Sequence, residues 1–207
     1  MKDSHEDLKI YGNMSISGGK YNDVIIHGRG VIQSELTVRN VKVNGNMVVN
    51  DSLKAEELKI NGSGKICDKS DVDFVEIYGH LKSTSSLQSS NIKCHGGLNI
   101  ECDLCSSRLD IQGEMKVKEN CSADEPKIIG NIKIGKELNA DNINIQLYKK
   151  SEIQEIVGGK IKIGRMSENK ISRFFQTIFP VDLFKNASLV VDTIEGEIGR
   201  ASCRERV

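Results

Sequence analysis

The side chains best suited to bind a metal or to carry redox chemistry in this sequence are its cysteines. Two of the six form a Cys102-x-x-Cys105 pair, with Cys94 and Cys121 nearby. A structural zinc site takes four ligands, usually two such pairs or one pair with two histidines. Cys94 and Cys121 stand where Ile and Leu occupy other copies of the repeat described below, so we expect them to be small buried hydrophobic residues. We therefore assign no metal, redox or disulfide role to a cysteine.

Histidines and glycine pairs could belong to an acyl-transfer or phosphate site. His27 and His95 each precede a glycine of the repeat, at a position that holds Tyr, Asn or Gln in other copies, so we expect an outward polar column. A left-handed hexapeptide acyltransferase would need a catalytic histidine between subunits and a strict six-residue period, whereas the period here is 17 rather than 18. The glycine pairs lack the Lys-Ser/Thr context of a phosphate loop and are expected in turns; they are Gly18-Gly19, Gly96-Gly97 and Gly158-Gly159.

Carboxylates that could cleave a sugar are scattered along the chain. The densest cluster comprises Asp68, Asp71, Asp73 and Glu76. A sugar-cleaving β-helix would place its carboxylates or basic groups together on one side wall. Asp71 and Asp73 flank Val72, a predicted core position, so we expect both to be solvated surface charges. The sequence predicts no catalytic residue and no cofactor.

The composition excludes several broad classes of protein. The chain has 207 residues, 38% hydrophobic and 28% charged, which is too apolar for disorder and too polar for a membrane-embedded protein. Lys and Arg number 29 and balance 29 Asp and Glu, which argues against nucleic acid as a partner. No apolar run approaches the roughly 20 residues of a membrane span, and the start is acidic and polar, unlike a signal peptide. We expect a cytoplasmic protein without an integral membrane segment.

Glycine recurs along the chain at a nearly constant interval. The first step is 16 residues and the next six are 17, at positions 12, 28, 45, 62, 79, 96, 113 and 130. Apolar residues keep the same interval two and four residues before most of these glycines and, in many copies, two and four residues after them. A third set, mostly Leu followed by a small residue, begins eight residues after the glycine. Alternation with period two indicates short strands with one face toward a core, and three such strands fit one turn of a parallel β-solenoid.

The repeat sets the predicted domain organisation. It runs from about Leu8 to Gly164, which corresponds to about nine turns, and the ladder glycines are expected at corners of the coil. The later turns drift, because Ile161-x-Ile163 is one residue out of register. With no Trp and 4% aromatic residues, the chain suits a narrow uniform core of Val, Ile and Leu. We predict an all-β chain, with one parallel β-helix over residues 1–164.

The composition changes after the predicted rod. Residues 165–186 hold four of the five phenylalanines and form a Phe-rich, partly helical insertion in our prediction. The spacing of Ile171, Phe174, Phe175 and Ile178 predicts a short amphipathic helix that ends before Pro180. Residues 187–197 are expected to form a terminal strand. The last residues, 198–207, resemble the translation of a common sequencing adaptor, so we expect them to be foreign to the natural protein.

Two apolar sets are candidates for self-assembly. A solenoid ends in open strand edges, whose N–H and C=O groups must be capped or paired. The candidates are Leu8, Ile10, Met14 and Ile16 at the first edge, and Phe174, Phe175, Phe179 and Phe184 in the insertion. The insertion could equally be a helix that caps the end of the rod. Several Lys and Arg residues near this end would allow peripheral contact with a membrane surface.

Three stretches of the chain carry a resemblance to a known family. They are DLKIYGNMSISGGKYNDVIIHGRGVI at residues 7–32, LNADNINIQL at residues 138–147 and IQEIVGGKIKI at residues 153–163. Together with the 17-residue repeat, they resemble the bactofilins, the polymer-forming cytoskeletal proteins of bacteria, and in particular their short Firmicute members. The resemblance covers most of residues 7–195. The chain departs from it in lacking a Pro-rich or membrane-targeting tail and in carrying the Phe-rich insertion.

This resemblance implies a right-handed β-helix that assembles end to end into non-polar filaments or scaffolds in the cytoplasm, without nucleotide. It also implies contact with cell-envelope or other scaffolded proteins, and peripheral attachment at the inner face of the membrane. We therefore expect a non-enzymatic scaffold whose main partner is itself. Two alternatives stay open: a solenoid adaptor that binds a partner protein without polymerising, and a solenoid enzyme acting on a sugar or an acyl group.

Overall fold

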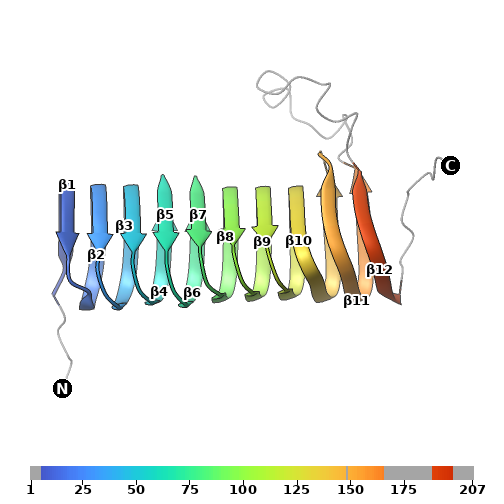
Figure 1. Cartoon of the computed structure of the whole chain (residues 1–207), viewed down its shortest axis with the longest axis horizontal. Helices are drawn as coiled ribbons and strands as arrows, with labels where there is room; N and C mark the ends of the chain where they lie inside the picture. The colour runs from blue at the N-terminus through green and yellow to red at the C-terminus, as the bar shows by residue number, and fades with distance from the viewer. Residues whose placement is uncertain (1–5, 148, 166–187, 198–207) are drawn as a thin grey trace.

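A computed structural model describes residues 6–147, 149–165 and 188–197 of the chain, and its regular elements are all strands. Neighbouring strands pair in parallel throughout one sheet that winds into about nine stacked turns (Figure 1). The prediction of an all-β parallel solenoid is confirmed. The strands are β1 (Leu8–Ile16), β2 (Gly19–Ile32), β3 (Leu36–Val49), β4 (Leu53–Ile60), β5 (Ser63–Ile66), β6 (Ser70–Ile77), β7 (His80–Ser83), β8 (Leu87–Ile100), β9 (Leu104–Val117), β10 (Cys121–Leu147), β11 (Ser151–Arg165) and β12 (Leu189–Glu197).

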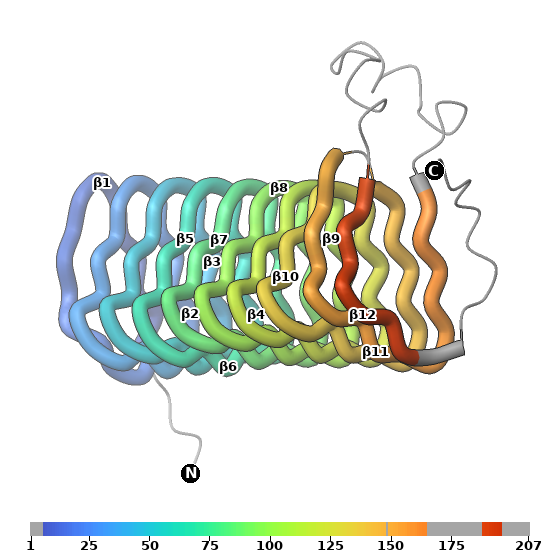
Figure 2. The backbone as a smooth tube through the Cα atoms, turned by 45° about the vertical axis from the view of Figure 1, so that its right-hand side comes forward, coloured from blue at the N-terminus to red at the C-terminus, as the bar shows by residue number. Residues whose placement is uncertain are grey.

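The strand register follows the glycine interval. Val41 pairs with Leu58, and Leu58 pairs with Val75, each step being 17 residues. Between β10 and β11 the step widens, with Leu138 opposite Ile156, 18 residues on, after an irregularity in the ladder. This widening is the predicted drift of the later turns. The constant step elsewhere keeps chemically similar side chains stacked in columns, and the tube view shows the resulting coil (Figure 2).

Each turn has three sides, which we number from their positions in β3: the first side is residues 36–38, the second 40–44 and the third 46–49. Alternate residues on each side point inward. In β3 the inward residues are all buried, and they are Leu36, Val38, Val41, Val43, Met47 and Val49. The core is therefore a stack of aliphatic layers, and the intervening residues form three outward faces.

The ladder glycines lie at the corner between the second and third sides, as predicted. Gly28 and Gly12 have positive φ angles of 124° and 78°, which favour glycine. The corner also brings successive turns close together. A Cβ added to Gly45, Gly79 or Gly96 would lie under 3.0 Å from the carbonyl oxygen of the ladder glycine one turn earlier. The absence of a side chain is thus required by close backbone approach as well as by conformation.

The last strand, β12, pairs in parallel with β11, with Ser151 opposite Leu189. It lies within the range in which a terminal strand was predicted. The predicted Phe-rich helical insertion, which contains Phe174, Phe175, Phe179 and Phe184, falls almost entirely outside the described residues. The same is true of residues 198–207, with the predicted adaptor sequence.

Ser70 interrupts the leucine column of the first side, between Leu53 and Leu87. It is 3% exposed, and its Oγ has no hydrogen-bond partner among the residues the structure describes. Ser70→Leu should therefore raise the free energy of unfolding by about 2 kcal/mol, by removing an unsatisfied hydroxyl and extending the apolar column. Ser70→Ala, which removes the hydroxyl without filling the column, should give about half of that gain. Urea unfolding followed by circular dichroism measures both; a loss of stability in Ser70→Leu would contradict the packing argument.

Candidate assembly surfaces

The N-terminal end of the rod is formed by β1. In the described part of the chain β1 pairs on one side only, with β2, and it forms one extreme of the sheet (Figure 1). The residues just before it continue the stack, because the Glu6 carbonyl accepts the Asn22 backbone N–H at 3.0 Å. The Asp7 carboxylate accepts the Asn22 side-chain amide at 3.1 Å. The end of the rod is thus an ordered strand whose outer row of peptide groups faces away from β2.

The four candidate residues at this end all lie on β1 but differ in exposure. Ile10 is fully buried, and Leu8 and Ile16 are half-buried against the core. Met14 is 45% exposed, although it occupies an inward column. Its partner in the next turn is Gly30, which offers no side chain to cover it. Met14 is therefore the apolar side chain that the rod presents along its own axis.

The opposite end exposes a residue that the sequence analysis did not single out. Ile194 of β12 continues the inward column of Leu138 and Ile156, yet it is 42% exposed. No described residue lies beyond it along the rod. Its alternation with Val191 within the predicted terminal strand was the available signal. Both described ends of the rod therefore show an apolar side chain from a core column.

The cysteines separate into buried and accessible thiols. Cys94 and Cys121 are fully buried, which confirms the prediction, and burial raises the pKa of each thiol to about 12. Thiols with such pKa values stay protonated and unreactive near neutral pH. Of the predicted pair, Cys105 is exposed and Cys102 is half-buried. Within the described ranges, no three His, Cys, Asp or Glu residues are grouped so that they could hold a metal ion.

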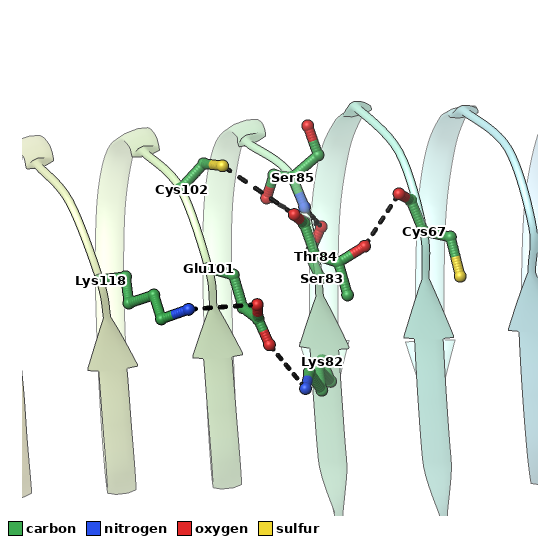
Figure 3. A network of polar contacts seen from close by, with 8 residues as sticks. All are labelled: Cys67, Lys82, Ser83, Thr84, Ser85, Glu101, Cys102 and Lys118. Atoms are coloured by element: carbon green, nitrogen blue, oxygen red, sulfur yellow. Dashed lines mark hydrogen bonds and ion pairs between the residues drawn. The ribbon is translucent and has the colours of Figure 1, made fainter.

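A polar network tightens the corner that follows the third side (Figure 3). Ser83 stands in a column otherwise filled by Ile66 and Ile100, and its Oγ donates to the carbonyl of Ser85 at 3.0 Å. The hydroxyl of Thr84 donates to the carbonyl of Cys67 in the preceding turn at 2.8 Å. These bonds satisfy the groups that leave the apolar column. The network is a structural corner.

Glu101 binds lysines from two neighbouring turns in the same region. Its carboxylate lies 2.6 Å from Lys82 Nζ and 3.4 Å from Lys118 Nζ (Figure 3). The hydrogen bond from Lys82, followed by the charge of Lys118, lowers the pKa of Glu101. All three side chains are partly solvated, so these pairs contribute little to stability.

The second side carries the predicted outward polar column. His27 stacks on Tyr11 with ring centroids 5.4 Å apart, and His95 stacks on Tyr78 at 5.2 Å. Between these pairs, the amide of Asn61 donates to Asn44 at 3.0 Å. Both histidines are exposed, which confirms their surface placement. Asp71 and Asp73 are exposed as well, as expected of solvated charges.

Phe74 was missed by the sequence analysis and lies in the middle of the second side. It is 56% exposed, and Tyr78 on the same strand is 52% exposed. The hydroxyl of Tyr78 donates to Glu76 at 2.9 Å, which is the main cause that lowers the pKa of Glu76. The available signal was a phenylalanine in a column that is otherwise polar, since its register partners are Glu57 and Asn91. An exposed aromatic residue of this kind often marks an interaction surface.

Two shallow depressions lie side by side on the first side, with volumes of about 260 and 340 Å³. They share Lys54 and Asp71, and neither lining includes a histidine. The first mixes acidic and basic side chains, among them Arg39 and Asp73. Neither brings together the convergent carboxylate and histidine pocket that the enzyme alternative requires.

The fold and its surfaces define a parallel β-solenoid with apolar core residues at both described ends and an aromatic residue on one side. In the ranges the structure describes, there is no helix long and apolar enough to cross a membrane. Comparison with protein-family models, with curated proteins and with solved structures found no match.

Proposed function

We propose that the protein is a bacterial cytoskeletal scaffold of the bactofilin-like kind, which self-assembles by end-to-end stacking of its solenoid without nucleotide. The observation that carries this proposal is β1, which pairs with β2 alone among the described strands and exposes Met14 along the rod axis. An unpaired strand edge with an apolar side chain is a template for a further strand. The resemblance to bactofilins in residues 7–32 and 138–163 supports the same reading.

Two modes of stacking use this edge. Head-to-tail stacking would place β12 of one copy on β1 of the next and continue the parallel ladder at about 4.8 Å per turn. Such a contact does not close, so it produces an open filament. Head-to-head stacking would pair two β1 strands in antiparallel fashion and yield the non-polar filament that the resemblance implies. Both modes bury β1.

The scaffold would act in the cytoplasm, with itself as main partner and with cell-envelope or other scaffolded proteins bound along its sides. Peripheral contact with the inner face of the membrane belongs to the same proposal. The exposed Phe74 favours one second candidate, a non-polymerising adaptor that binds a partner protein through a side of the rod.

Negative-stain electron microscopy combined with light scattering tests the proposal. We expect nucleotide-free filaments many rods long, whose amount rises with protein concentration and does not change when nucleotide is added. A discrete monomer or dimer across a wide range of concentration and salt would rule out polymerisation as the main activity. The adaptor candidate would then be preferred.

A further inference from the structure

The second side presents a flat outward face whose central residues come from β6 and β8. The outward residues of this face are Phe74, Glu76 and Tyr78 in β6 and Asn91, Lys93 and His95 in β8, in direct register. The rod runs straight and its turns stack evenly (Figure 1). A flat sheet face of this kind can pack on another sheet about 10 Å away.

The charges on this face alternate along the rod instead of sharing one sign. The middle outward position of successive turns is occupied by Lys42, Lys59, Glu76, Lys93, Asp110 and Lys127. The third side differs, because one of its outward columns holds lysines at four of five successive described turns.

That column contains Lys65, Lys82, Lys116 and Lys133, and Asn99 stands between the second and third of them. Two copies brought together through the third side would oppose lysine to lysine, which disfavours the contact. The second side is free of this problem.

We infer that two copies of the chain associate face to face through their second sides, with the rods antiparallel. The two-fold axis would run parallel to the strands and pass midway between β6 and β8. This axis exchanges β6 with β8 of the second copy and β4 with β9 of the second copy. It therefore places Glu76 opposite Lys93, Lys59 opposite Asp110, and Glu57 opposite Arg108 in the other copy. Each of the three opposite-charge pairs occurs twice, as the symmetry requires.

The same axis brings the exposed aromatic residues to the centre of the contact. Phe74 of each copy would lie one turn from the axis-related Phe74, close enough for the two rings to pack in an offset arrangement. Tyr78 would lie opposite His95 of the second copy, which extends the aromatic stacks already formed within each rod. Burial of Phe74, now 56% exposed, supplies the apolar anchor that a charged face otherwise lacks.

Neighbouring arrangements are less favourable. An axis through β6 would oppose Glu76 to itself, and an axis through β8 would oppose Lys93 to itself. Parallel rods would oppose every charge in the middle column to its own copy. The face spans eight turns of about 4.8 Å and a strand width of about 16 Å, so the contact would bury about 600 Å² on each copy. A total near 1,200 Å² is at the low end for a specific interface and suits a reversible, salt-sensitive association.

This lateral contact uses the sides of the rod, so it is independent of end-to-end stacking and goes beyond the proposed scaffold. Glu57 and Arg108 provide the sharpest test, because they lie on β4 and β9, separated by β6 and β8 within one copy. A coupling between them can only arise between copies. Within its own rod Glu57 pairs with Lys59 at 2.9 Å on the surface, so changing it does not disturb the core.

The experiment is sedimentation velocity at low salt on chains that also carry Met14→Lys, which is argued in the Discussion to block the end contact. We expect a dimer. Glu57→Arg or Arg108→Glu alone should weaken dimerisation at least about tenfold, since each puts like charges in contact twice. An equimolar mixture of the two single variants should recover the dimer, and so should the double variant Glu57→Arg/Arg108→Glu.

Lys65→Glu on the third side is the matched charge-reversal control and should leave dimerisation unchanged. A monomer at all concentrations in the Met14→Lys background would overturn the inference, whether or not the unmodified chain forms filaments. Single reversals without effect would overturn it too. A mixture of the two single variants that stays monomeric would equally overturn the antiparallel register. Filament loss with the dimer retained would count against end-to-end stacking alone.

Discussion

Gly96→Ala is expected to lower the free energy of unfolding by about 3 kcal/mol or more, because a methyl group has no space at this corner of the rod. A Cβ at Gly96 would lie under 3.0 Å from the carbonyl oxygen of Gly79 in the preceding turn. That oxygen is fixed, since it accepts the backbone N–H of Gly97 at 2.8 Å. Gly96 has no positive φ, so the effect comes from the clash and not from a left-handed conformation. Relief would require two turns to separate and the ladder between them to break.

Gly97→Ala is the matched control, one residue further along the same strand. The nearest atom to a Cβ there is Cδ2 of His80, at 2.6 Å. The imidazole is exposed and can turn away, so we expect a loss below about 1 kcal/mol. Thermal and urea unfolding followed by circular dichroism compare the two variants with the unchanged chain. Similar losses in both, or a neutral Gly96→Ala, would show that the turns can separate at this corner at little cost.

The interval between ladder glycines was enough to predict the stacking of the turns. In a parallel solenoid a constant step places each residue on its counterpart one turn away, so that side chains of the same kind form columns. The columns through Val41, Leu58 and Val75 follow directly from that step. Burial of Cys94 and Cys121 followed as well, because their columns are otherwise aliphatic. Inward positions are thus predictable, since one shared core constrains them all.

Outward positions carry no such constraint, and the sequence analysis failed there. A solvated column accepts almost any side chain, so Phe74 among polar residues gave only a weak signal. The stacking of Tyr78 on His95 depends on side-chain rotamers that alternation does not determine. Pairing of charges between copies depends on a symmetry axis that no periodicity within one chain reveals. Ser70 shows the converse case, in which the column predicts Leu and the chain has a polar residue.

Met14→Lys is expected to abolish filament growth through the β1 end while leaving the fold of each copy intact. In a single copy Met14 is 45% exposed and lies over Gly30, so a lysine there keeps its ammonium group in water. In a stack, the next copy would cover this position and bury an unpaired charge, which costs several kcal/mol. Since about 1.4 kcal/mol changes an equilibrium tenfold, the critical concentration for assembly should rise at least about 100-fold.

Ser15→Lys is the matched control, because it adds the same charge on the same strand but on the exposed side wall, where stacking does not cover it. Filaments should form normally in this variant. Electron microscopy and light scattering of both variants also distinguish the two modes of stacking. Head-to-tail stacking loses every end contact in Met14→Lys, whereas alternating head-to-head stacking keeps the contacts between β12 ends and leaves dimeric rods. Long filaments in Met14→Lys at unchanged concentration would show that β1 is not an assembly surface, because no stack through that edge can avoid burying the new charge.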